Sequence, residues 1–161
     1  MNKEFPLSYP EREGIVFDVS SIYDRYIDIE DVDISKVQKD MFVAFYSGYI
    51  ETEGYGTKKY FSKHPQLSNS LIDILIDKEI SIIGIDFAGI RRGKEHTLKD
   101  QVCADRNVFV VENLCNFDKI LAGEKSNNFT AHTYPIKFEG LTGLPCRVIG
   151  KIYEDKQRRN S

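Results

Sequence analysis

The chain has 161 residues, of which 41% are hydrophobic and 29% are charged, and its formal net charge is −3. This length suits one domain with a core of its own, and the composition excludes a disordered chain, a collagen and a disulfide-built miniprotein. The slight acidity argues against a general nucleic-acid binder, and the three cysteines, at no paired spacing, are typical of a reducing cytoplasm.

Targeting and membrane segments are not expected. The first residues contain no apolar run, and the longest apolar stretches, 71–76 and 80–85, are far shorter than the roughly 20 residues of a spanning helix. We therefore expect a cytoplasmic protein with one domain over residues 1–161 and a flexible polar tail at 154–161.

The first part of the chain predicts two strands and a long loop. Residues 14–20 and 41–46 are short, apolar runs of the kind that forms strands. The acidic stretch 24–33 between them is typical of a solvated loop or helix edge, and a Gly-, Tyr- and Lys-rich loop is expected as far as Lys63.

A helix and a buried strand are predicted next. Apolar residues at helical spacing within 67–78 indicate the helix, for which Ser70 and Asp73 form a candidate capping box. Residues 80–86 are apolar on both faces, as in a central parallel strand. Together they indicate a right-handed crossover that returns to pair with strand 41–46.

The second half adds shorter elements and completes a mixed α/β fold. Pro135 favours an edge or bulged position for its strand, and the basic loop is expected to be solvated. In chain order we expect a basic loop, a helix, a buried strand, a helical turn and two strands: 91–94, 98–106, 107–111, 116–121, 129–138 and 147–153.

Two carboxylates end buried strands, where chemistry in α/β domains usually collects. Asp86 and Glu112 could each bind a metal, act as a base or hold a loop through backbone amides. His64 and His96 are interpreted as surface or capping residues, and His132 as a strand histidine in the core or a cleft. No HExxH, CxxC or phosphate-loop motif is present, so these residues alone do not define a reaction.

Three segments resemble, in the right order, motifs of the cyclase family that includes the bacterial kynurenine formamidases and isatin hydrolases. Residues 81–89 (SIIGIDFAG) resemble the family's GID strand, and residues 108–117 (VFVVENLCNF) resemble its ENL strand and turn. Residues 129–147 resemble its closing segment, and the similarity covers roughly residues 12 to 152.

The resemblance implies a fold, an activity and an assembly. The fold would be a swivelling β/β/α domain with a mixed sheet and flanking helices, assembled as a homodimer or homotetramer. The activity would be hydrolysis of amide or cyclic amide bonds in a small molecule, as in the kynurenine formamidases (arylformamidases), with a divalent metal, zinc or manganese. No nucleic-acid or membrane partner is implied.

The family's metal site has two parts, and the sequence matches only the second. The first part, an N-terminal HxGTHxDxPxH motif, is absent from this sequence, which resembles a member without that N-terminal portion. In the second part, Glu112 keeps the family's Glu, while Asp100 and Gln101 stand where the family has a pair of histidines. The resemblance thus implies Asp100 and Glu112 as metal ligands in an incomplete site, and Gln101 cannot act as a base.

Three functions remain open at this point. The chain could have lost independent catalysis and bind no metal. It could be an active hydrolase with a rebuilt site, in which Glu112, His96 and His132 are catalytic and Asp100 is a ligand; on a continuous helix His96 and Asp100 would share a face. It could also be a non-catalytic binding or assembly module, or a subunit that completes its site with a full-length partner.

Overall fold

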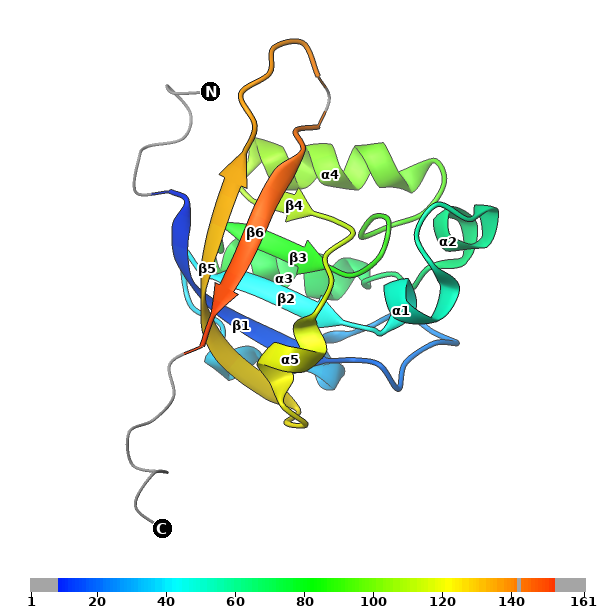
Figure 1. Ribbon diagram of the computed structural model, residues 1–161, viewed down its shortest axis with the longest axis horizontal. Coiled ribbons are helices and arrows are strands. Elements are labelled where there is room, and N and C mark those ends of the chain that lie inside the picture. Colours follow the sequence, from blue (N-terminus) through cyan, green and yellow to red (C-terminus); the bar gives the residue numbers. More distant parts are fainter. Residues whose placement is uncertain (1–8, 142, 153–161) are drawn as a thin grey trace.

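Six strands form one mixed sheet in the computed structural model, which describes residues 9–141 and 143–152 (Figure 1). Their order across the sheet is β4-β3-β2-β1-β5-β6. The predicted mixed α/β architecture is confirmed, whereas the tail expected at 154–161 lies outside the described residues. Four strands run parallel to one another, namely β1 Glu11–Asp18, β2 Phe42–Tyr46, β3 Ile82–Ile85 and β4 Phe109–Val111. Two more run antiparallel to their neighbours, namely β5 Ser126–Pro135 beside β1 and β6 Cys146–Lys151 beside β5.

Helices cover both faces of the parallel strands. In Figure 1, α3 lies behind these strands, and α5 lies in front of them together with the β5–β6 pair.

The helices of the described residues are α1 Tyr49–Glu53, α2 Lys58–Lys63, α3 Asn69–Asp77, α4 Glu95–Asp105 and α5 Phe117–Leu121, with 3-10 turns η1 Ile29–Asp31 and η2 Ile34–Lys36. None of them, within residues 9–141 and 143–152, reaches the length and hydropathy of a membrane-spanning segment.

The core consists of two apolar layers, one on each face of the parallel strands. On one face, strand residues such as Val43 and Ile83 pack with Leu71 and Leu75 of α3. On the other face, Phe42, Ala44 and Ile82 pack with residues of α5 and β5, including Phe117 and Phe129. Burial on both faces explains why these strands have continuous apolar runs rather than an alternating pattern.

The segment predicted as a loop up to Lys63 instead contains α1 and α2. The Thr57 hydroxyl caps α2 by accepting a hydrogen bond from Tyr60 N at 3.0 Å, and the Tyr60 ring stacks on Tyr49 with centroids 5.7 Å apart. The glycines of this segment form the turns around two short helices, which tertiary aromatic contacts then stabilise.

Two further details correct the expectations. The N-cap of α3 is Ser68, whose Oγ accepts a hydrogen bond from Leu71 N at 3.0 Å, so the capping box expected at Ser70 is wrong. The strand expected at an edge is interior, because β5 lies between β1 and β6. Pro135 is tolerated there because it is the last residue of the strand.

The carboxyl ends of the four parallel strands lie along the same side of the sheet, which we call its carboxyl edge. In Figure 1 their arrows point toward α1 and α2, and α4 begins beside the same edge. Asp86 directly follows β3 and Glu112 directly follows β4, so both carboxylates predicted to carry chemistry are at this edge.

Candidate metal centre

Three side chains from α4 and the end of β4 converge at this edge. His96 Nε2 lies 3.0 Å from Asp100 Oδ2 and 3.0 Å from Glu112 Oε1. One donor atom from each of the three residues lies within 4.8 Å of the others. His96 and Asp100 share one face of α4 because they are four residues apart, and β4 carries Glu112 to that face.

The start of α4 is held in place by Arg91. Its guanidinium donates to Glu95 Oε2 from Nε at 2.9 Å and to the Leu67 carbonyl oxygen from Nη1 at 3.0 Å, and it lies over the Tyr26 ring. Arg91 is only 4% exposed, so the expectation of a solvated basic loop is wrong for this residue. These bonds anchor the first turn of α4, the turn that also carries His96.

Gly89 makes room for the His96 imidazole. Its φ is +119°, and a Cβ atom there would lie 3.0 Å from His96 Cε1, 3.1 Å from Nε2 and 2.9 Å from the Arg91 carbonyl oxygen. A side chain at this position would therefore press on both the ring and the backbone. Sequence reasoning did not single out Gly89, because a glycine after a strand ordinarily marks a turn.

Burial shapes the electrostatics of the cluster. Loss of solvation raises the pKa of Asp100 to about 6, with His96 opposing the shift and Glu112 adding to it. The same loss of solvation raises the pKa of Glu112, again opposed by His96. Two crowded carboxylates on one imidazole favour a further positive charge at this point.

One oxygen of the cluster lacks a hydrogen-bond partner. Asp100 Oδ1 is buried, and within the described residues nothing donates to it. A buried carboxylate oxygen without a partner is costly, and a bound cation would satisfy it. An imidazole nitrogen and two carboxylates are ligands that zinc and manganese accept, so His96, Asp100 and Glu112 fit a divalent metal.

Asp86, the other strand-end carboxylate, holds a loop. Its side chain is 0% exposed and accepts hydrogen bonds from Ser47 N at 3.0 Å, Ser47 Oγ at 2.6 Å and Gly48 N at 2.6 Å. Burial raises its pKa to about 6, against the effect of these bonds. Of the three roles left open for Asp86, metal ligand, base or loop clamp, these contacts match the loop clamp.

The remaining histidines lie apart from the cluster or are buried. His132 is on β5, paired in register with Glu11 at the start of β1. It therefore lies near the amino ends of the parallel strands, whereas Glu112 lies at their carboxyl ends. The structure does not bring it together with His96, Asp100 and Glu112. His64 is only 1% exposed and stacks on Phe87, so the surface position expected for it is wrong; burial lowers its pKa to about 4.

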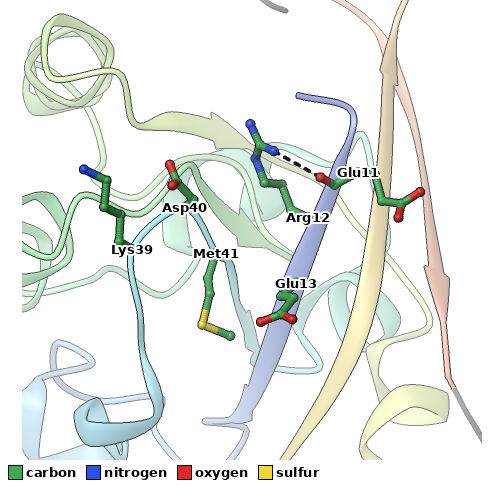
Figure 2. A pocket seen from close by; sticks show the side chains of 6 residues that line it. All are labelled: Glu11, Arg12, Glu13, Lys39, Asp40 and Met41. Atoms are coloured by element: carbon green, nitrogen blue, oxygen red, sulfur yellow. Dashed lines mark hydrogen bonds between the residues drawn. The ribbon is translucent and has the colours of Figure 1, made fainter. Parts of the chain in front are cut away.

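An open hollow of about 200 Å³ lies at the amino ends of β1 and β2 (Figure 2). Its two basic side chains have partners, since Arg12 Nε donates to Ser81 Oγ at 3.2 Å and Lys39 pairs with Glu79. It belongs to the edge opposite Glu112, and we assign it no chemistry.

Comparison with known proteins identifies the family. Residues 2–91, more than half of the chain, match the family described as Putative cyclase. The chain belongs to this family. The resemblance drawn from the sequence motifs is thereby confirmed, although the matched residues end before α4, so the metal centre itself rests on the geometry above.

Solved structures share the cyclase-family fold. An isatin hydrolase bound to the product analogue thioisatinate has a TM-score of 0.76 and 16% identity, over 91% of this chain and 62% of that chain. A predicted metal-dependent hydrolase from Bacillus stearothermophilus has a TM-score of 0.69 and 21% identity, over 90% of this chain and 65% of that chain.

A third structure, described as a potential metal-dependent hydrolase with cyclase activity, has a TM-score of 0.70 and 21% identity, over 90% of this chain and 67% of that chain. This chain therefore spans about two thirds of the length of these structures. No curated protein matches it.

Proposed function

We propose that this cyclase-family chain is a divalent-metal-dependent hydrolase of amide or cyclic amide bonds, with His96, Asp100 and Glu112 as metal ligands. The observation that carries the proposal is the buried, unpartnered Oδ1 of Asp100 within a cluster whose donor atoms lie within 4.8 Å of one another. Two of the structural relatives are described as metal-dependent hydrolases, which supports the same chemistry.

The residues of this chain would each have a defined task. A divalent metal, when bound, polarises a carbonyl group and lowers the pKa of a bound water. Glu112 and Asp100 supply negative charge that matches the charge of the cation, and His96 supplies a nitrogen ligand held between them. Their side chains are 25%, 31% and 37% exposed, respectively, so a small substrate and water can reach the cluster.

The test measures metal binding and hydrolysis separately. After chelator treatment, calorimetric titration with Mn²⁺ and with Zn²⁺ should show one site per chain, and D100N should lose it. D105N is the matched control, because Asp105 is an exposed carboxylate on the same helix. Turnover of N-formylkynurenine or isatin should disappear in E112Q. Equal metal binding by the wild type and D100N would contradict the proposal.

A second candidate function follows from the partial exposure of all three ligands. Groups from another chain could reach the cluster and complete its coordination, so the protein would act as a subunit beside a full-length cyclase-family partner. Co-purification with such a partner, with metal bound by the complex and not by the isolated chain, would favour this function over the first.

A further inference from the structure

A buried tyrosine connects α2 to the residue that follows Glu112. The Tyr60 hydroxyl donates a hydrogen bond to Asn113 Oδ1 at 2.8 Å and lies 3.4 Å from the carbonyl oxygen of Asp86. Tyr60 is 0% exposed, and burial raises its pKa, an effect to which Asp86 and Glu112 add. The raised pKa favours the protonated hydroxyl, which is the form that donates to Asn113.

Asn113 forms the bend where the chain leaves β4. Its φ is 59°, in the left-handed region that asparagine tolerates better than other residues with a side chain. Asn113 N donates to the Phe87 carbonyl oxygen at 3.2 Å, and Leu114 N donates to the Ile85 carbonyl oxygen at 3.0 Å. Because Asn113 N belongs to the peptide unit that joins Glu112 to Asn113, these bonds couple the conformation of Asn113 to the position of the Glu112 backbone.

We propose that Tyr60 is a positioning residue for the metal centre: through Asn113, its hydroxyl holds the Glu112 backbone in the orientation that brings the carboxylate to His96. This inference rests on the proposed function, and it adds a residue that no ligand pattern in the sequence indicates. Tyr60 bonds to Asn113 and to none of the three ligands. Partners that orient metal ligands in this way change metal affinity by about 10- to 100-fold when they are removed.

The first test removes one hydroxyl and leaves the ring. In Y60F, the dissociation constant for Mn²⁺, measured by calorimetry, should rise about 10-fold. Y49F is the matched control, because Tyr49 stacks on Tyr60 and its hydroxyl donates to the Lys59 carbonyl oxygen at 3.1 Å, away from Asn113. Y49F should bind Mn²⁺ as the wild type does. Wild-type affinity in Y60F would overturn the inference.

A second variant tests the route through Asn113. N113G keeps a residue that accepts a positive φ but removes the acceptor of the Tyr60 hydroxyl, so it should weaken Mn²⁺ binding by a factor similar to that of Y60F. If Tyr60 acts through Asn113, the double variant Y60F/N113G should bind no more weakly than N113G alone. Losses that multiply would show that Tyr60 acts by another route and would overturn the inference.

Crystal structures separate this inference from the proposed function. The Glu112 Oε1 to His96 Nε2 distance is 3.0 Å here, and it should lengthen in metal-free Y60F but not in Y49F. If the wild type binds no metal, the proposed function fails, while this comparison still decides the positioning role. An unchanged distance in Y60F overturns that role.

Discussion

Gly89 and His96 occupy adjoining space at the carboxyl edge of the sheet, so that a single added methyl group at Gly89 would lie 3.0 Å from the imidazole. The size of the side chain at position 89 thus decides whether His96 can lie between Asp100 and Glu112. This relationship makes Gly89 a sensitive position for testing the metal centre.

Replacement of Gly89 with alanine should weaken metal binding. The methyl group displaces the His96 ring and collides with the Arg91 carbonyl oxygen, so we expect the Mn²⁺ dissociation constant to rise at least about 10-fold. The positive φ adds a cost of about 1–3 kcal/mol in the free energy of unfolding. Calorimetry and urea denaturation measure the two effects.

Gly93→Ala separates displacement of the histidine from backbone strain. Gly93 also has a positive φ, +60°, but a Cβ atom there meets nothing within 4 Å. G93A should lose stability and keep the wild-type Mn²⁺ affinity. Equal losses of affinity in G89A and G93A would show that strain, rather than contact with His96, affects the site.

Asp100 should make the stability of the metal-free protein depend on pH. Its pKa is about 6 in the folded chain, above the ordinary value of 3.8, so the folded state holds its proton more tightly than the unfolded state. The contribution of Asp100 to stability is therefore fully present below about pH 4 and is lost as the pH rises through 6. D100N removes this titration and should exceed the wild type in free energy of unfolding at pH 8, by at most about 3 kcal/mol.

Urea denaturation of chelator-treated protein between pH 4 and pH 8 measures this effect. The advantage of D100N over the wild type should shrink as the pH falls, while D105N should follow the wild type throughout. An advantage that grows on acidification would contradict the expected direction of the Asp100 shift.

The helix cap at Ser68 gives a test of the fold. Ser68 Oγ accepts from Leu71 N at 3.0 Å and donates to Asp28 Oδ1 at 2.8 Å, so S68A removes a cap and a tertiary hydrogen bond. The free energy of unfolding should fall by about 1–2 kcal/mol. S70A alters an exposed serine and should change it by less than about 0.5 kcal/mol. A larger loss of stability in S70A than in S68A would indicate that Ser70, rather than Ser68, caps α3.

The parallel strands and α3 could be predicted because local patterns report burial on both faces. The continuous apolar runs at 41–46 and 80–86 correspond to β2 and β3, and their parallel pairing through a helical crossover is as expected. The two short helices at 49–63 could not be predicted, because they are stabilised by tertiary contacts such as the Tyr49–Tyr60 stack. The glycine-rich local sequence gives no sign of these contacts.

By itself, the sequence determined that this is an α/β chain of the cyclase family and that Glu112 follows a strand, although β4 is a half-buried outer strand rather than the buried one expected. Only the tertiary structure decided that His96 meets Glu112, because that contact joins residues 16 apart and requires β4 to pair with β3 beneath α4. It also decided that Asp86 clamps a loop and that His132 lies at the other edge. Residue type and spacing specify what a side chain can do, but strand order and register determine which side chains come within bonding distance.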